Sequence, residues 1–432
     1  MPESGKAIHA SVTAGAKHPR VEQLILFAVL ILPVMVLFKR VPAEIAVGLT
    51  VIIGLGVAIR RKDFSWLAAE WFYAAAAVSL ILLVLAPFSL NPGYSAMSAI
   101  LALRWPIFAA VLIWLFVSRP RALALFEWAM LTIIGFIVID TIIQYVFGRD
   151  LFGYPSFGPL RLSGPFAHPM VGTFTDRVWF IGLATLFYAM LRRRPKWALW
   201  VLVATSGIGA LVLFLTGERA AFLTFMLGSL VVIIGILIHV PQWRRLLLAG
   251  LVAVALAAGV VAAKQPQMVQ RTIDSSWQTI THLDSTVYGL NFMSAWAEFQ
   301  ARPWTGVGAR QFMAYCNDYL PTYKAQYPKF GFETSCVIHP HNFYTGMLAE
   351  GGILAFLAFV AMVGFLFILL IRDAFRRSQP MQAYFGGAVL LTSFWPLQSS
   401  MEYFNGWTAA VIWTGVAWAL ARARIPFANH HA

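Results

Sequence analysis

The stretch HPHNFYTGMLAEGG, residues 339–352, places two histidines one residue either side of a proline and follows them with Asn342. An imidazole has an ordinary pKa of about 6.5, so His339 or His341 could act as a general base at neutral pH. A helix N-terminus beside that base would favour an anion such as a phosphate. Alternatively, Asn342 is suited to cap the apolar helix that follows, and Pro340 holds the approach extended. The motif therefore predicts a helix cap, a reaction centre, or both.

Arginines that precede apolar segments are a second chemical signal. Arg219, in LTGERAAFLTF, falls in the first turn of an apolar segment, where a cation opposes the helix dipole. Its guanidinium suits bidentate binding of a phosphate, although a charge pair with Glu218 at a wet helix end is the alternative. Arg161, in RLSGPFAHPMVGTF, is either an ordinary loop arginine or a second cation for a pyrophosphate. His168 in that loop is a weaker candidate for substrate binding, because a lone loop histidine is usually only hydrogen-bonded.

The elements that position these residues are apolar segments. Of the 432 residues, 60% are hydrophobic and 12% are charged, and the mean hydropathy is +0.73, which is typical of a polytopic membrane protein. The net charge of +14 lies in short clusters between apolar runs, a pattern that indicates topology and not a nucleic-acid partner. We expect an all-α fold with about twelve transmembrane helices, near residues 22–38, 43–59, 65–87, 96–118, 122–147, 171–191, 197–215, 220–239, 245–263, 342–371, 381–400 and 406–421.

The basic clusters predict the orientation of these spans. With an uncleaved first span and both termini in the cytoplasm, most Lys and Arg residues fall in cytoplasmic loops beside span ends. The long segment 264–341 then lies outside, between the ninth and tenth spans. We therefore expect one integral membrane domain over residues 1–432, with the segment 264–341 inserted between two spans as an external loop that contains short helices.

Two features of that loop have structural consequences. In NFMSAWAEFQ, Phe292, Trp296 and Phe299 form one apolar helical face, which could lie on the membrane surface or cap the spans. Cys316 and Cys336 could form a disulfide in an oxidising compartment, with two buried thiols as the alternative.

The absence of common nucleotide-binding and metal-binding motifs limits the reactions that this protein could catalyse. The sequence has no GxxxxGK[ST] phosphate loop, no DxD pair, no HExxH and no CxxC. An active site outside the cytoplasm would also lack ATP and nucleotide-sugars. We therefore expect no cofactor and no metal, and a donor that arrives already activated, most simply on a lipid.

Together, RLSGPFAHP, TGERAAF, PWTGVGARQF seven residues after a tryptophan, and HPHNFYTGMLAEGGILAF resemble the O-antigen ligase and O-antigen polymerase superfamily of polytopic bacterial enzymes. The order of the motifs, the number of spans and the late periplasmic loop agree over most of the chain. The resemblance implies a protein of the bacterial inner membrane whose segment 264–341 is a periplasmic loop. It also implies glycosyl transfer on the periplasmic face, without metal or nucleotide. The donor would be a glycan on undecaprenyl pyrophosphate, and the acceptor of a ligase would be a lipid A–core sugar.

The resemblance also assigns roles to residues. His341 would match the proposed base that activates the acceptor hydroxyl, and the doubled His339 favours the ligase branch. Arg219 would contact the donor pyrophosphate, with Arg161 in support, and Glu350 matches a structural acidic position.

This chain departs from the relatives at Phe292, where they commonly carry an arginine. Either Arg302 or Arg310 takes the role of that arginine, or this branch binds its donor differently. Arg302 and Arg310 are therefore further candidates for substrate binding, and so is Asn342 beside the histidines.

Two alternatives remain. A polymerase of the same superfamily would join lipid-linked repeat units. A twelve-span secondary transporter would fit the topology, but transporters tend to carry charges near the membrane midplane, and we assign only Glu70, Glu127 and Asp140 as acidic residues within the spans.

Overall fold

The computed structural model describes residues 40–158, 160–283, 286–326, 339–398 and 401–425. It is all-α in these residues, apart from short connections and one isolated bridge. The longer helices are α3 (Arg40–Arg61), α4 (Glu70–Leu85), α5 (Pro92–Ala102), α6 (Arg104–Ser118), α7 (Pro120–Phe147), α8 (Val171–Arg193), α9 (Pro195–Leu215), α10 (Arg219–His239), α11 (Arg244–Lys264), α14 (Val287–Ala301), α15 (Phe312–Gln326), α16 (Phe343–Arg376), α17 (Pro380–Phe394) and α18 (Gly406–Arg424). Between α11 and α14 lie α12 (Pro266–Val269), the π-helix η4 (Gln270–Asp274) and α13 (Ser275–Thr281).

Nine helical stretches of the described chain are long and apolar enough to cross a membrane. They are Val41–Arg61, Glu70–Phe88, Pro92–Ser118, Pro120–Phe147, Val171–Arg193, Pro195–Leu215, Arg219–His239, Pro241–Lys264 and Phe343–Arg376. Each coincides with a predicted span, so the prediction of a multi-pass all-α membrane protein is confirmed. The predicted span at 22–38 lies outside the described residues, and the count of twelve remains a prediction.

Two predicted spans form helices that do not meet this criterion. The helix α17 has 15 residues, fewer than the roughly 20 that cross a bilayer. The helix α18 has 19 residues and is buried along almost its whole length, against α6, α8, α16 and α17. A helix enclosed by other helices does not contact lipid, so it tolerates the Gly, Thr, Trp and Arg residues that lower its hydropathy.

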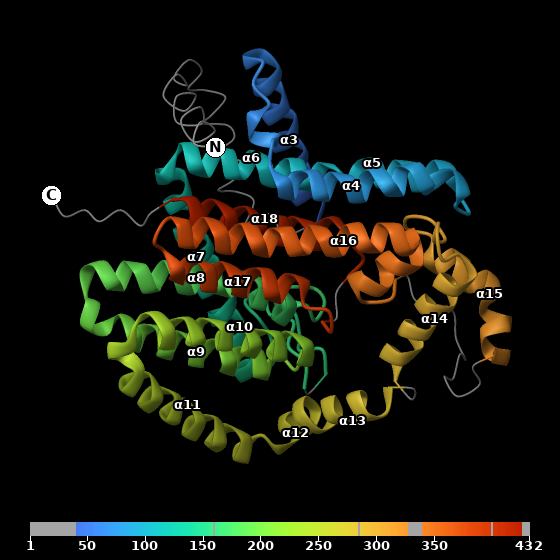
Figure 1. Cartoon of the computed structure of the whole chain (residues 1–432). Helices are drawn as coiled ribbons and strands as arrows, with labels where there is room; N and C mark the ends of the chain where they lie inside the picture. Colours follow the sequence, from blue (N-terminus) through green and yellow to red (C-terminus); the bar gives the residue numbers. More distant parts are fainter. Residues whose placement is uncertain (1–39, 159, 284–285, 327–338, 399–400, 426–432) are drawn as a thin grey trace.

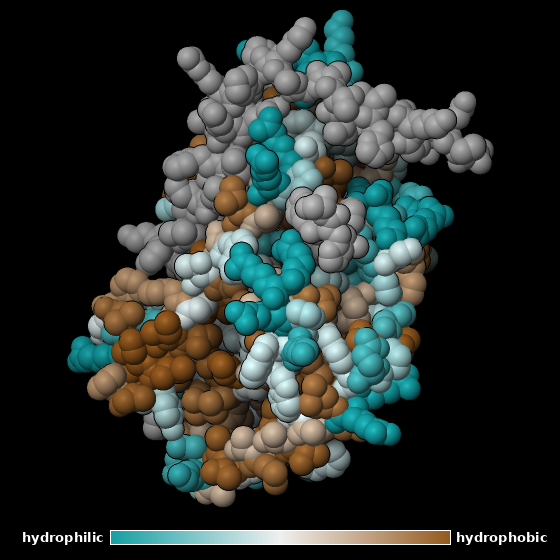
Figure 2. Space-filling model, turned by 90° about the vertical axis from the view of Figure 1, so that its left-hand side faces the viewer, coloured by the Kyte–Doolittle hydropathy of each residue, from teal (hydrophilic) through white to brown (hydrophobic). Residues whose placement is uncertain are grey.

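The helices have two distinct ends (Figure 1). At one, which we call the basic end, lie the turns between α8 and α9, between α10 and α11 and between α16 and α17, with the clusters Arg192–Arg194, Arg244–Arg245 and Arg376–Arg377. At the other, the loop end, lie α14, α15 and the start of α16. Figure 2 looks onto the basic end, where hydrophilic residues gather across the middle of the face. The basic clusters thus share one end, as the predicted topology requires.

Ion pairs and tryptophans hold the helices together near the basic end. The carboxylate of Glu127 on α7 accepts bonds from Arg422 (2.6 Å) and Trp418 (2.9 Å) of α18. Glu70 at the start of α4 pairs with Arg372 of α16 at 3.1 Å. Both acidic residues therefore have structural partners.

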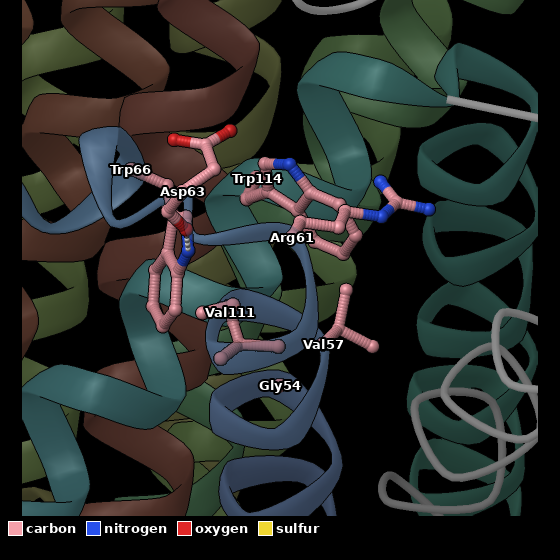
Figure 3. A pocket seen from close by; sticks show the side chains of 8 residues that line it. Gly54, Val57, Arg61, Asp63, Trp66, Val111 and Trp114 are labelled. Carbon is pink, nitrogen blue, oxygen red and sulfur yellow. Dashed lines mark hydrogen bonds between the residues drawn. The ribbon is translucent and has the colours of Figure 1, made fainter. Parts of the chain in front are cut away.

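A small pocket between α3 and α6 is lined by aromatic and charged side chains (Figure 3). Arg61 lies over the ring of Trp114, 5.9 Å from its centroid, and the indole of Trp66 donates to the carbonyl of Asp63. Arginine and tryptophan together are typical of a membrane–water interface.

The predicted helix in the long segment exists as α14, but its packing differs from the expectation. Its small and polar residues, among them Ser294, Ala295 and Glu298, are buried, and the helix packs on α16 and α15. Phe292 and Trp296 are exposed. Its apolar face therefore does not cap the spans.

Candidate active site

The two histidines of the HPHN motif contact each other at the loop end. His339 is buried and His341 is half-buried, and the centroids of their rings are 4.2 Å apart. The backbone N–H of His341 donates to Nδ1 of His339 at 3.2 Å, which uses the lone pair of that nitrogen. No described residue forms a hydrogen bond with the ring nitrogens of His341. The ring of His341 is thus the one left able to accept a proton from a substrate.

Burial keeps both rings neutral. It lowers the pKa of His339, and it lowers the pKa of His341 to about 4, with the neighbouring His339 as a second cause. A neutral imidazole carries the lone pair that a general base needs. His341 also has φ +54°, a left-handed conformation that is uncommon outside glycine and more frequent for Asn, Asp and His.

Asn342 caps α16, as the sequence predicts. Its Oδ1 accepts from the N–H groups of Tyr344 (2.9 Å) and Thr345 (3.2 Å). Its Nδ2 donates to the carbonyls of Pro396 (2.6 Å) and Gln398 (3.3 Å), which follow α17. The amide therefore fixes the backbone after the histidines in two directions at once.

The helix that carries this motif is broken at Gly352, which has φ +64° and ψ −167°. The segment 303–308 occupies the break: the N–H groups of Val307 and Gly308 donate to the carbonyls of residues 349 and 350, and Ile353 donates to the carbonyl of Pro303. Backbone groups freed by a break at membrane depth must find partners in the protein. The PWTGVG and AEGG motifs therefore pack together through backbone hydrogen bonds, and we call this contact between residues 303–308 and 349–353 the joint.

Gly306 is the tightest point of this joint and gives a prediction on stability. It has φ +65°, and a Cβ there would meet the carbonyl carbon of Glu350 at 2.4 Å. We expect Gly306→Ala to cost at least about 1–3 kcal/mol, because both backbone strain and a backbone clash oppose it. The measurement is the melting temperature of the purified protein in detergent. Gly364→Ala on α16 is the matched control, since a Cβ there meets nothing within 4 Å. Equal melting temperatures for both variants would contradict the claim that the packing of Gly306 against the break in α16 stabilises the protein.

A small cavity lies beside the histidines. His339, Glu350, Glu402 and Tyr403 are among the residues that line it. Glu402 pairs with Arg310 at 2.9 Å, so Arg310 lies next to this cavity but its guanidinium is engaged.

A further carboxyl group lies behind this cavity. Glu298 of α14 is fully buried, and its oxygens have no hydrogen-bond partner among the described residues. Burial and the nearby Glu350 raise the pKa of Glu298 well above its usual range. His339 therefore lies beside a cavity lined by Glu350 and Glu402, and Arg310 pairs with the second of these carboxylates.

Three arginines form a second cluster at the loop end. Nε of Arg271, in η4, donates to the carbonyl of Gly217 at 3.2 Å, and Nη1 of Arg219 lies 3.5 Å from the hydroxyl of Thr279 on α13. Burial lowers the pKa of Arg271, and the adjacent charges of Arg161 and Arg219 lower it further. Among the described residues, no acidic side chain lies within ion-pair distance of these three arginines. We call Arg161, Arg219 and Arg271 the arginine cluster.

Glu218 does not pair with Arg219 as the alternative interpretation required. Its carboxylate accepts from the N–H groups of Gly172 (2.7 Å) and Thr173 (3.0 Å), in the first turn of α8. It thus compensates the dipole of a neighbouring helix. Burial raises the pKa of Glu218, with these hydrogen bonds and the charge of Arg161 opposing that effect.

Residues 403–407 connect the two clusters. Tyr403 lines the cavity of the histidines, and its ring contacts Phe404 with a centroid separation of 5.4 Å. Trp407 packs against Phe166, in the loop that carries Arg161, at 6.1 Å. The histidines and the arginine cluster therefore belong to one connected part of the loop end.

Other predicted site residues lie elsewhere or have other contacts. His168 is exposed before α8, and no interaction of its ring connects it with either cluster in the described chain. Arg302 donates to the carbonyl of Phe88 at 2.6 Å and lies over the ring of Tyr315. It contacts neither cluster directly. Phe292, at the position where relatives carry an arginine, is exposed on α14.

Sequence reasoning missed Arg271, because nothing in its local sequence distinguishes it from other arginines of the long segment. Its importance comes from a contact with Gly217, 54 residues away. Two acidic residues within the spans were also not recognised from the sequence: Asp176 on α8, which accepts from Thr224 at 2.7 Å, and Glu350 on α16. The acidic content of the spans is therefore higher than predicted.

Within the described chain, no three His, Cys, Asp or Glu side chains are placed to hold a metal ion. Cys316 on α15 is buried and disulfide-bonded, while Cys336 lies outside the described residues.

Comparison with known families finds a match within this chain. Residues 204–360 match the model of the Wzy_C family, described as O-antigen ligase. The match contains Arg219, Arg271 and both histidines, and it bears out the resemblance seen in the motifs. Residues 204–360 thus form a Wzy_C O-antigen ligase domain, of a family of glycan-transferring enzymes that includes ligases and polymerases. No curated protein matches this chain.

Proposed function

We propose that this protein is an inverting, metal-independent glycosyltransferase of the bacterial inner membrane, with its site facing the periplasm. It transfers an O-antigen glycan from undecaprenyl pyrophosphate to a lipid A–core acceptor. The observation that carries this proposal is the arginine cluster, three guanidinium groups with no acidic side chain at ion-pair distance in the described chain, in the same part of the loop end as a neutral histidine. A pyrophosphate is an anion that such a cluster suits, since guanidinium groups bind phosphate oxygens in pairs.

The chemistry follows from these two clusters. The acceptor hydroxyl transfers its proton to His341, and its oxygen forms a bond to the anomeric carbon of the donor. The bond between that carbon and the pyrophosphate oxygen breaks, and undecaprenyl pyrophosphate leaves with the electron pair. Arg161, Arg219 and Arg271 stabilise the charge that develops on the leaving group. Backside attack inverts the configuration at the anomeric carbon.

His339 has a positioning role in this mechanism. Its Nδ1 accepts from the backbone of His341, and this bond stabilises the left-handed conformation that directs the ring of His341. The amide of Asn342 fixes the same backbone from the other side.

Reconstitution tests the function. The purified protein in proteoliposomes receives a lipid-linked glycan together with lipid A–core, or the lipid-linked glycan alone. We expect glycan attached to lipid A–core, with release of undecaprenyl pyrophosphate. Longer lipid-linked chains in the absence of lipid A–core would indicate a polymerase instead. Absence of both products would contradict glycosyl transfer and reopen the transporter alternative.

The lowered pKa of His341 predicts an unusual pH profile. A base must be unprotonated, so kcat/KM should fall by half only near pH 4, whereas an ordinary histidine would lose half its activity near about pH 6.5. An anionic donor beside the ring favours its protonated form, so the acid limb of kcat should lie at higher pH than that of kcat/KM. In His339→Gln the limb of kcat/KM should also move to higher pH, because a neighbour that lowers the pKa is gone. A limb that does not move in this variant would argue against His341 as the titrating group.

A further inference from the structure

The helical segment after α11 has three different faces. It runs from Pro266 to Thr281 through α12, η4 and α13. Ile273, Trp277 and Ile280 are exposed by 59%, 67% and 71%, and their spacing of four and three residues places them on one side. Asp274, Gln278, Thr281 and His282 are exposed polar residues beside that apolar face. Arg271 and Thr279 face the protein.

The depth of this segment is fixed by its contacts. Arg271 bonds to Gly217 and Thr279 to Arg219, so two residues eight positions apart contact the turn between α9 and α10 and the first residue of α10. Both α9 and α10 are candidate membrane spans, so these contacts lie at the loop end of two candidate spans. At the start of the segment, Gln265 donates to the hydroxyl of Tyr145, near the loop end of α7. The segment therefore stays in contact with the loop ends of α7, α9 and α10 on its way to α14 (Figure 1).

The apolar face follows a candidate span whose apolar side chains are largely exposed. The preceding helix α11 is the least buried of the candidate spans, with Leu248, Val252, Leu256 and Val260 all more than half exposed. Only Gln265 separates it from α12. Tryptophan prefers the membrane–water interface, and an amphipathic helix with one apolar face lies in that interface with the face buried among the acyl chains.

We propose that residues 266–281 form an interfacial helix that inserts Ile273, Trp277 and Ile280 into the lipid leaflet at the loop end. Its polar face meets water, and its third face holds Arg271 against the turn before Arg219. The partner of the apolar face is the bilayer surface itself. The helix thereby sets the depth of the arginine cluster at the level of phosphate headgroups, where the pyrophosphate of a lipid-linked donor would lie.

Depth measurements with an environment-sensitive fluorophore test this. Ile280→Cys and its matched control Gln278→Cys, two positions apart on the same helix, are labelled in proteoliposomes of anionic and zwitterionic phospholipid; labelling is carried out without reductant because Cys316 is disulfide-bonded. The label at residue 280 should be quenched by nitroxide-bearing lipids and protected from aqueous iodide. The label at residue 278 should show the reverse. Equal quenching by iodide at both positions would overturn the inference, as would protection of residue 280 from both quenchers, which would mean that protein covers this face.

A kinetic experiment, which rests on the proposed function, tests whether the interfacial helix positions the arginine cluster for donor binding. Trp277→Asp should raise the KM for the lipid-linked donor several-fold and leave kcat nearly unchanged, whereas Trp197→Asp, at an exposed tryptophan of the basic end, should change neither. An unchanged KM in Trp277→Asp would overturn the link to the donor. The fluorescence measurement needs no glycan transfer, so a failure of the proposed function and a failure of this inference are distinguishable.

Discussion

Replacing His341 with asparagine should reduce glycan transfer by about two to four orders of magnitude, the usual contribution of a general base. Asparagine adopts the left-handed conformation readily, so the strain at φ +54° does not increase and α16 keeps its cap. The loss should appear in kcat, because the lone pair of the imidazole acts when the acceptor hydroxyl attacks. The measurement is initial-rate kinetics in proteoliposomes at pH 7, with the melting temperature as a check on folding.

A second variant separates chemistry from structure. His341→Gly removes the ring, accepts the same backbone conformation and leaves a space beside His339. Added imidazole should restore part of the activity of His341→Gly and none of the activity of an arginine variant. If His341→Asn retains the activity of the parent protein, or if imidazole restores no activity to His341→Gly but does so in His339→Gly, the base is not His341.

Replacing Arg219 with alanine should lower transfer by about two to three orders of magnitude. Removal of one preorganised group that stabilises developing charge has costs of this size, equivalent to about 3–4 kcal/mol. We also expect Arg271→Ala to lower the rate of glycan transfer, since both guanidinium groups belong to one cluster. Competition by inorganic pyrophosphate should weaken in both variants, because the anion loses a ligand.

Arg149→Ala is the matched control for these changes. Arg149 is exposed in the loop after α7, and its guanidinium bonds only weakly to a carbonyl, at 3.4 Å from Gly153. Its removal changes the net charge equally but leaves the arginine cluster complete. Equal losses in Arg149→Ala and Arg219→Ala would mean that general charge, and not the cluster, attracts the donor.

Local patterns were sufficient to predict much of this structure. Apolar segments of the required length gave the positions of the candidate spans, and the Asn342 cap followed from one residue before a helical run. The predicted spans at 381–400 and 406–421 form the helices α17 and α18, which are not among the nine candidate spans of the described chain. The burial of α18 among other helices depends on contacts that hydropathy does not encode.

The candidate site was less predictable, since it depends on contacts between distant residues. Arg271 joins Arg219 through a fold-back over Gly217, and Arg310 is engaged by Glu402, about ninety positions later in the chain. No periodicity or motif encodes either contact. Glu218 is the converse case: its chemistry was recognised from the sequence, but its partner is α8 and not the adjacent arginine.

The joint at Gly352 has a consequence for biogenesis. The segment 303–308 is synthesised before α16, yet it must occupy the break in α16 before the backbone there is satisfied. The first turns of α16, which follow His341 and Asn342, therefore reach their final place only after the segment 303–308 has docked. We expect a nascent chain with a misfolded segment to expose unpaired amides at this break, a state that membrane quality-control proteases can recognise. Competence for catalysis and escape from degradation would then depend on the same docking event.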